Sequence, residues 1–220
     1  MASSVDIGTS NRILTIAEGL FAQHGFEGTT MRMITAAARV NLAAANYHYG
    51  DKQSLFLEVI SNRMRAINQA RLSSLDQAEA WAGDGLVPLA TLVELLAQPL
   101  FALCQDGDVG GAHAARLIGR CMTEPNPLLG EIVATEIQPV MGRFGQALRR
   151  HAPTLPPEDF LWRLSFVAGS LHHSLATLHC MSKLTRGFCR DNDGHGALRR
   201  FIPFAVGALT CGAPSGSLCA

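Results

Sequence analysis

The segment from Thr30 to Lys52, TMRMITAAARVNLAAANYHYGDK, constrains the fold most, because it holds two short helical patterns separated by a turn. The first helix is expected to begin at an N-cap on Thr30. A turn through residues 39–41 follows, and the second helix begins near Leu42. Such a pair is a helix-turn-helix. The residues expected to pack in it are Met33, Ile34 and either Ala37 or Ala38 in the first helix, and Leu42 and Ala45 in the second.

The outward face of the second helix has few charges and several side chains that suit contact with bases. In a helix-turn-helix, outward residues of the second helix enter the major groove of DNA. The Asn46 amide can make two hydrogen bonds to adenine, and Ala43 and Ala44 offer small apolar surfaces to thymine methyl groups. A solvated or capping Asn46, and simple helix propensity of the two alanines, are the alternatives. Double-stranded DNA is therefore the leading partner.

Phosphate contacts are expected around the start of the following helix. Tyr47 and Lys52, with the N–H groups that open that helix, suit an anion. Arg39 can reach a phosphate or remain a surface charge, and His48 can contact a phosphate or close the domain with a hydrogen bond. The candidate DNA-binding residues are Thr30, Arg39, Asn41, Ala43, Ala44, Asn46, Tyr47, His48 and Lys52.

The first 60 or so residues resemble the DNA-binding domain of the TetR/AcrR family of transcriptional regulators. The resemblance implies a homodimeric regulator with a DNA-binding domain of three helices, followed by a larger helical domain that binds a ligand and dimerises. The positions that carry it are Ile13, Ala17, Leu20, Phe21, Gly25 and Phe26, then Thr29, Thr30 and Ile34, and finally Val40, Tyr47, His48, Tyr49 and Lys52.

One departure from the family pattern refines the resemblance. The family usually has Leu then Tyr where this chain has Ala45 then Asn46. The run AAANYHY, together with the segment HAPTLPPEDFLWRLSFVAGS at residues 151–170, looks like a subgroup that includes repressors responsive to fatty acids or acyl-CoA. The resemblance thus suggests a lipid-like effector.

Composition excludes several other classes of protein. The 18 Lys and Arg residues balance the 18 Asp and Glu residues, which argues against strong nonspecific DNA binding but not against a dimer that places a few groups on phosphates. The six cysteines form no C-x-x-C pair, which indicates a reducing cytoplasm. No signal peptide and no apolar run of membrane-spanning length is apparent, so a soluble cytoplasmic protein is expected, without a membrane partner.

Helical periodicity dominates the chain, so the predicted fold class is all-α. We expect a helix-turn-helix domain over residues 1–52, a ligand-binding and dimerisation domain over 53–212 and a flexible tail over 213–220. Asp51 is the expected N-cap of a long linking helix, and Pro139 is expected to kink the helix that contains it. The predicted helices outside the helix-turn-helix cover residues 10–24, 52–75, 88–105, 111–123, 126–150, 157–184 and 195–211.

Apolar residues of the second domain predict a small-molecule pocket between its helices. Arg116 and Arg120, one turn apart, can pair with a carboxylate or phosphate of the ligand, or can be surface arginines or partners in dimer salt bridges. The candidate ligand-binding residues are Phe101, Arg116, Arg120, Met122, Val133, Ile137, Met141, Trp162 and Phe166.

The two last long helices suit a dimer interface, because in TetR-like proteins the last two helices of each subunit form a four-helix bundle. The alternative is that the same side chains fill the core of one chain. The candidates are Phe160, Leu164, Leu171, Leu178, Phe201, Phe204 and Leu209.

The residues His172, His173, His179 and Cys180 raise a different hypothesis, a metal-dependent helical sensor or enzyme. His172 and His179 share a helix face but lie roughly 10 Å apart along it, too far for one ion. Packed histidines are the preferred reading, so neither a metal nor a cofactor is predicted. No catalytic motif is apparent, and an enzyme is not expected. A dimeric binding protein that has lost DNA recognition is a third hypothesis, supported only by the neutral N-terminal domain.

Overall fold

The computed structural model describes residues 4–104 and 108–211, and within these ranges the protein is helical without a β-strand. The all-α prediction is therefore confirmed. The α-helices are α1 (Ser4–Gly28), α2 (Met31–Ala38), α3 (Leu42–Tyr49), α4 (Lys52–Ala82), α5 (Leu89–Phe101), α6 (Val109–Thr123), α7 (Leu129–Ile132), α8 (Gln138–Arg149), α9 (Pro157–Thr177), α10 (Met181–Leu184) and α11 (Gly194–Thr210); the π-helix η1 (Val133–Ile137) joins α7 to α8, and the 3-10 turn η2 (Leu178–Cys180) joins α9 to α10.

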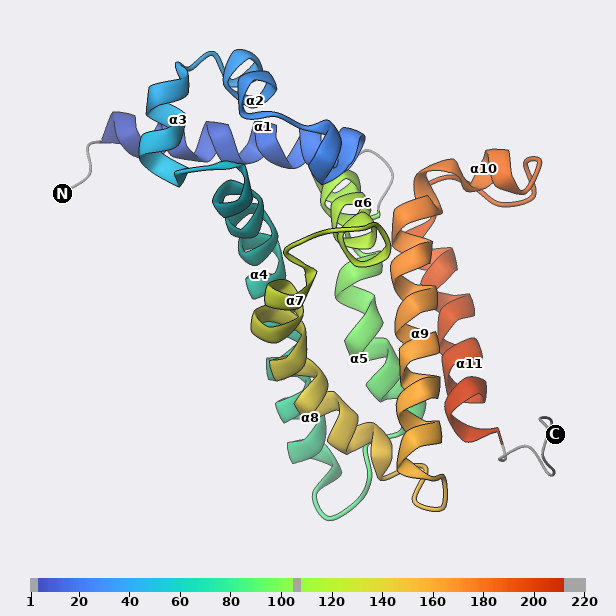
Figure 1. Ribbon diagram of the computed structural model, residues 1–220. Helices are drawn as coiled ribbons and strands as arrows, with labels where there is room; N and C mark the ends of the chain where they lie inside the picture. The colour runs from blue at the N-terminus through green and yellow to red at the C-terminus, as the bar shows by residue number, and fades with distance from the viewer. Residues whose placement is uncertain (1–3, 105–107, 212–220) are drawn as a thin grey trace, which may run out of the picture.

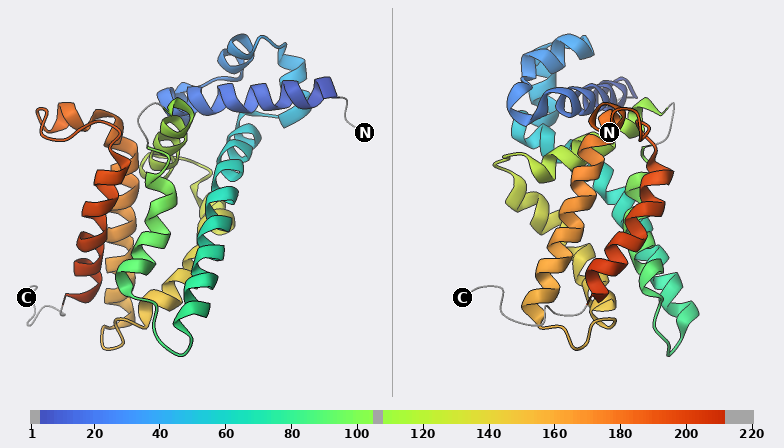
Figure 2. Two further views of the ribbon diagram at one scale, coloured as in Figure 1. Left: turned by 180° about the vertical axis from the view of Figure 1, so that it is seen from behind. Right: turned by 90° about the vertical axis from the view of Figure 1, so that its right-hand side faces the viewer.

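The helices form two packed units that share α4 (Figure 1). Helices α1, α2 and α3 form a head at one end of the molecule, and α4 runs from this head along the side of the larger bundle. Helices α9 and α11 lie side by side on the side of the bundle opposite α4 (Figure 2). No helix in the described residues is both long and apolar enough to cross a membrane.

An aromatic cluster and one ion pair hold the head to α4. The ring centroid of Phe56 lies 4.9 Å from that of Phe21 and 5.0 Å from that of Phe26, both in edge-to-face geometry. Beside this cluster, the Arg63 guanidinium donates two hydrogen bonds, of 2.5 and 2.9 Å, to the buried carboxylate of Glu18. Such a bidentate pair fixes both position and direction, so α1 and α4 meet in a defined orientation.

The exit from α1 differs slightly from the predicted stop at Gly25. The α1 assignment runs to Gly28, but Gly25 has φ of 74° and breaks the helical geometry there. Glycine tolerates this left-handed region at little cost. The buried Thr29 hydroxyl then donates to the Gly25 carbonyl at 2.8 Å, which fixes the path of the chain into α2.

The kink expected at Pro139 takes the form of a π-helix. Residues 126–150 are divided into α7, η1 and α8, and Pro139 lies in the first turn of α8 directly after η1. Proline has no N–H and crowds the preceding turn, so a wider turn before it relieves both problems. Within the π-helix, the Glu136 carbonyl accepts a hydrogen bond of 2.8 Å from the Asn68 side chain on α4.

The single helix predicted for residues 157–184 is wrong at its C-terminal end, where η2 interrupts it. A continuous helix would pair the Ser182 N–H with the Leu178 carbonyl. Instead, the Asp191 carboxylate accepts from the Ser182 N–H at 2.6 Å, and the Leu178 carbonyl accepts from the Asn192 N–H at 3.0 Å. Asp191 and Asn192 therefore bind the two groups that a continuous helix would pair, and the helix is interrupted there.

Helices α6 and α9 cross closely, and this crossing depends on Gly119. A Cβ atom at Gly119 would lie 2.4 Å from the Ala176 nitrogen and 2.8 Å from the His172 carbonyl oxygen, both backbone atoms of α9. Since backbone cannot move aside as a flexible side chain can, any larger residue would separate the two helices.

We predict that Gly119→Ala lowers the free energy of unfolding by roughly 1–3 kcal/mol, because the added methyl group overpacks this crossing. Urea unfolding followed by circular dichroism measures the change. The matched control is Gly142→Ala in α8, where an added Cβ meets nothing within 4 Å; it should stabilise by about 0.5–1 kcal/mol. Equal effects from both substitutions would contradict the close crossing.

Candidate nucleic-acid interface and internal cavity

The helix-turn-helix begins and turns where the sequence predicts. The Thr30 hydroxyl caps α2 by accepting from the Met33 N–H at 3.2 Å, and the Asn41 side-chain oxygen caps α3 by accepting from the Ala44 N–H at 2.6 Å. Between the helices, Arg39 adopts the left-handed conformation, with φ of 54°, and its N–H donates back to α2. Thr30 and Asn41 therefore define the helix starts, and each retains side-chain hydrogens that can donate outward.

The packed face of this unit is narrower than expected. Ile34 and Ala45 are buried as predicted, and Ala38 is the buried one of the two alternative alanines, but Met33 is only half-buried and Leu42 keeps 41% of its surface exposed. Leu42 is the first residue of α3, beside a turn that is itself largely exposed, so few atoms are available to cover it. The small side chain of Ala45 is the buried contact of α3 with the rest of the head.

The outward face of α3 carries the predicted reading residues. Tyr47 is 82% exposed, and Ala43 and Asn46 are also exposed, whereas Ala44 is half-buried. The His48 ring lies against both neighbouring tyrosine rings, with its centroid 5.5 Å from that of Tyr47. These side chains share one short helix at the free end of the head (Figure 1).

Lys52 and Tyr49 make internal contacts that close the head. The Lys52 ammonium donates to the Phe26 carbonyl at 3.1 Å and lies 4.2 Å from the centroid of the Phe26 ring. The Tyr49 hydroxyl donates to the Ser10 carbonyl at 2.9 Å. Lys52, which the sequence suggested as a phosphate ligand, thus holds the start of α4 against the end of α1. Two of its three ammonium hydrogens remain available to an anion.

A second contact joins the head to the bundle, through Arg120 of α6. Its guanidinium donates to the carbonyls of Ala22 and Gln23 near the end of α1, at 3.1 and 2.9 Å, and pairs with Glu124 at 2.6 Å. The last carbonyls of a helical segment lack intrahelical donors, and a cation there is favourable. Arg120 is therefore a bridge between the two units, and it borders only a void of about 10 Å³ at this joint.

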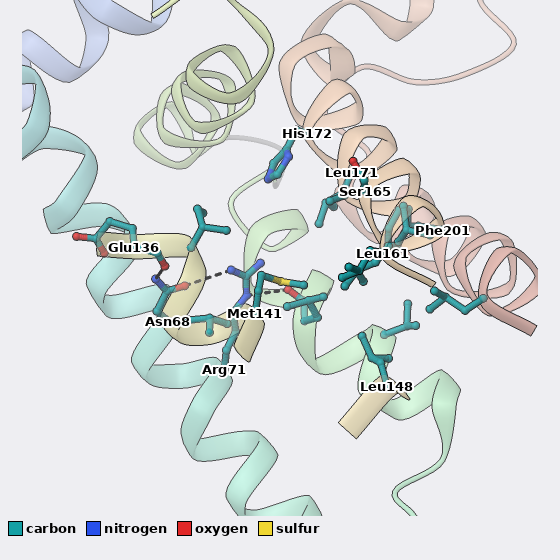
Figure 3. Close-up of a pocket in the computed structure, with 18 residues that line it drawn as sticks. Asn68, Arg71, Glu136, Met141, Leu148, Leu161, Ser165, Leu171, His172 and Phe201 are labelled. Atoms are coloured by element: carbon teal, nitrogen blue, oxygen red, sulfur yellow. Dashed lines mark hydrogen bonds between the residues drawn. The ribbon is translucent and has the colours of Figure 1, made fainter. Parts of the chain in front are cut away.

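A partly open cavity of about 250 Å³ lies between α4, α5, η1, α8, α9 and α11 (Figure 3). Of the predicted ligand-binding residues, only Ile137 and Met141 line it. Thirteen of its lining residues are apolar, and the polar ones are Asn68, Arg71, Glu136, Ser165 and His172. Sequence reasoning missed Arg71 and used His172 only in a metal hypothesis.

The remaining candidates for the pocket lie elsewhere. Trp162 and Phe166, one turn apart on α9, are 57% and 63% exposed, with ring centroids 5.7 Å apart. Phe101 borders a separate groove beside α11, and Met122 borders a much smaller void beside α4. Val133 and Arg116 are half-buried outside the cavity. The apolar pattern identified the bundle helices but not which side of each faces inward.

Arg71 is a buried cation held by neutral groups. Its Nε donates to the Leu96 carbonyl at 2.8 Å and its Nη1 to the Asn68 side-chain oxygen at 3.2 Å. Burial disfavours the charged form and lowers the pKa of Arg71 to about 10, so the side chain is still a cation at neutral pH. The same burial, reinforced by the nearby Arg71 charge, lowers the pKa of His172 to about 4 and keeps its imidazole neutral.

The four residues of the metal hypothesis do not converge. His172 borders the cavity, His173 borders the groove beside α11, and the Cys180 thiol donates to the Thr177 carbonyl. Within the described ranges, no three histidine, cysteine or acidic side chains lie close enough together to hold a metal ion. The geometry therefore gives no support to that alternative.

Comparison with protein families decides the class of protein. Residues 13–59 match the model described as bacterial regulatory proteins, tetR family, and residues 94–208, more than half of the chain, match the tetracyclin repressor-like C-terminal domain. The chain belongs to the TetR family. Its α1–α3 head is accordingly the helix-turn-helix DNA-binding domain of a transcriptional regulator, and α5–α11 lie in the C-terminal domain region.

Curated relatives match only part of this TetR-family chain. Over 81 residues it is 33% identical to the HTH-type transcriptional repressor AcnR of Corynebacterium efficiens, which covers 37% of the chain and 38% of that repressor. Over 75 residues it is 36% identical to the AcnR repressor of Corynebacterium glutamicum, covering 34% and 35%. The chain thus spans less than two fifths of the length of these relatives.

Solved structures match over nearly the whole chain. A HlyIIR mutant protein superposes with a TM-score of 0.57 at 16% identity, covering 92% of this chain and 97% of that one. The probable transcriptional regulatory protein RHA5900 gives a TM-score of 0.56 at 15% identity, covering 93% and 100%. At such identities the similarity concerns the TetR fold alone.

The neutral state of His172 predicts a specific acid sensitivity. The folded pKa of about 4 lies below the ordinary value of 6.5, so the unfolded chain binds more protons between these values. Stability from this residue is fully present above pH 6.5 and is lost as the pH falls toward 4. The loss should reach about 3 kcal/mol at pH 4.

Urea unfolding of the parent and of His172→Gln, from pH 7 to pH 4, tests this expectation. The variant should gain stability relative to the parent as the pH falls. The control His195→Gln replaces an exposed histidine on α11, and its difference from the parent should stay nearly constant. A constant difference for His172→Gln as well would show that the imidazole is not held neutral.

Proposed function

We propose that this TetR-family regulator is a transcriptional repressor that binds a palindromic operator as a homodimer, with a DNA affinity modulated by a small apolar effector. The observation that carries the proposal is the exposed outer face of α3, on a head that α4 and α6 hold rigidly to the bundle. The partial matches to AcnR repressors support repression rather than activation. Each subunit would read one half-site, with the half-sites about one helical turn apart or somewhat more.

On DNA, positioning and reading fall to different residues of the head. Asn46 and the methyl groups of Ala43 and Ala44 would meet base edges, since they lie on the outward side of α3. The exposed Tyr47 hydroxyl would bind a phosphate. Thr30, Arg39, Asn41, His48 and Lys52 would add contacts to the DNA backbone.

We predict that Tyr47→Ala weakens DNA binding by about tenfold on every sequence, because a hydrogen bond to a charged phosphate is lost. Asn46→Ala should instead lower the preference for the operator, by about 1–3 kcal/mol per adenine contact. Fluorescence anisotropy on the DNA upstream of the protein's own gene and on a scrambled fragment, at near-physiological salt, measures both effects.

The control for these variants is Gln146→Ala, which removes an exposed amide from α8, far from the head. It should bind both fragments as the parent does. An equal loss on both fragments for Asn46→Ala would exclude its role as a reader. Equal weak binding of the parent to both fragments would favour a binding protein without DNA recognition, or an operator elsewhere.

The dimer would form through α9 and α11, but through a different face of α9 from the predicted one. Phe160, Leu171, Leu178, Phe201 and Leu209 are buried within the chain, and Leu164 is half-buried, so these side chains build the subunit core. The apolar residues left exposed on the two helices are Leu161, Trp162, Phe166 and Phe204. Of the residues that the sequence suggested for the dimer interface, Phe204 is the one in this exposed set.

We predict that Phe166→Glu converts the dimer to monomers, because it places a charge in the desolvated centre of the interface. Sedimentation velocity at micromolar concentration measures the change. The matched control is Phe188→Glu, at a phenylalanine that is 93% exposed beyond α10. It should leave the dimer intact. A Phe166→Glu dimer of unchanged stability would place the interface elsewhere.

The effector would bind in the cavity beside α4. A ligand that binds better when α4 is tilted would favour the DNA-incompetent state, since a population shift needs only differential affinity. Resemblance to the fatty-acid and acyl-CoA subgroup adds that the effector is lipid-like. In this scheme residues 1–52 bind DNA and 53–212 bind ligand and dimerise; the tail proposed for 213–220 lies outside the described residues.

A further inference from the structure

The apolar cavity contains one positive charge that no acidic side chain of the described residues neutralises. Arg71 projects from α4 into the cavity and is 5% exposed. Its two hydrogen-bond acceptors, the Leu96 carbonyl and the Asn68 amide, are both neutral. Removing a cation from water costs several kcal/mol unless an anion offsets it. These neutral acceptors pair with N–H groups of the Arg71 guanidinium, but they do not balance its positive charge.

The unused part of the guanidinium faces the cavity. Nε and Nη1 are engaged, whereas Nη2 has no hydrogen-bond partner among the residues that the structure describes. Figure 3 shows the guanidinium directed into the space between α4 and α9, with Asn68 beside it. Two N–H groups of a fixed, planar cation therefore point at empty volume, which is the geometry that accepts an oxygen of a carboxylate.

Glu136, the one acidic residue that lines the cavity, does not fill this role. Its backbone carbonyl accepts the bond from Asn68, while its side-chain carboxylate points away from Arg71 in Figure 3. In the described part of the chain, Arg71 forms no ion pair with it or with another carboxylate. Since no described residue supplies the counter-charge, a bound anion would be a fitting source of it.

The opposite wall offers a neutral donor. Figure 3 shows the His172 ring directed from α9 into the cavity, toward the same space as the guanidinium. Because this imidazole is uncharged at neutral pH, the polar end of the cavity carries a net charge of +1. A monoanion balances that charge, whereas a phosphate monoester, with almost two negative charges, would leave an excess.

The rest of the cavity sets the size of the ligand. Leu, Ile, Val, Met and Phe side chains line its remainder, so the part of the ligand beyond the anion is hydrocarbon. The volume of about 250 Å³ lies just below the usual range for ligand pockets. If each non-hydrogen atom with its hydrogens takes about 30 Å³, as a water molecule does in the liquid, the cavity holds roughly eight such atoms.

We propose that the cavity binds a monocarboxylate with a short hydrocarbon tail, whose carboxylate takes Nη2 of Arg71 and the ring N–H of His172. The proposal rests on the effector role assigned above to this cavity and names the chemical class of the effector. A free acid of about five to eight carbons fits, whereas an acyl thioester has no carboxylate to offer.

The test is calorimetric titration of the full-length protein, without DNA, with sodium octanoate, 1-octanol and octyl phosphate. Octanoate should bind at least tenfold more tightly than either of the others. Affinity should rise about fourfold per methylene from hexanoate to octanoate, as expected for burial of apolar surface. Equal affinities for octanoate and octanol, a preference for octyl phosphate, or the absence of octanoate binding would each overturn the proposal.

Two arginine variants locate the anion. Arg71→Met should reduce octanoate affinity to that of octanol, whereas Arg116→Met, at a half-buried arginine outside the cavity, should change it less than twofold. The reverse pattern would overturn the assignment to Arg71. Should Arg71→Met fail to fold, the comparison of octanoate with octanol on the parent protein still decides the question.

Anisotropy on operator DNA, with and without octanoate, separates this inference from the proposed function. Octanoate binding that leaves DNA affinity unchanged would uphold the carboxylate site and remove its role as an effector site. Specific operator binding by a protein that does not bind octanoate would uphold the regulator and overturn the carboxylate site.

Discussion

The attachment of α4 to both the head and the bundle is the constraint on which the rest of the structure depends. At the head end, the Phe56 ring and the Arg63 guanidinium fix α4 to α1. Further along, Asn68 and Arg71 fix it to the π-helix and to α5. A single stiff helix thus carries contacts of the DNA-binding head and of the cavity wall. Any rearrangement around Arg71 must either bend α4 or move the head.

Local signals in the sequence were sufficient to predict the head. Side chains of Thr30, Asn41 and Asp51 each cap a helix through an N–H three residues ahead, a rule that requires no knowledge of distant contacts. The bundle was harder, because α9 is apolar on two sides. Periodicity therefore could not tell Phe160, which is buried in the core, from Phe166, which is exposed outside it.

Arg71 could not be recognised from the sequence for a related reason. It lies in a helix rich in polar residues, where a lone arginine normally faces water. Only the packing of α5 and η1 against α4 buries it. Arg120 is the opposite case. Its spacing from Arg116 suggested a ligand site, but its guanidinium binds carbonyls of α1, almost a hundred residues earlier in the chain. Long-range contacts decide the role of an arginine.

The Arg120 bridge also sets how freely sequences of this kind can diverge. Because its guanidinium binds the backbone carbonyls of Ala22 and Gln23, it does not read their side chains, and the exposed position 23 can vary without loss of the joint. Gly25 has no such freedom: a Cβ there would lie 2.9 Å from Nη2 of Arg120, on a backbone that already has positive φ. Among relatives that keep this joint, arginine and glycine should therefore be inherited as a pair, whereas the residue at position 23 drifts.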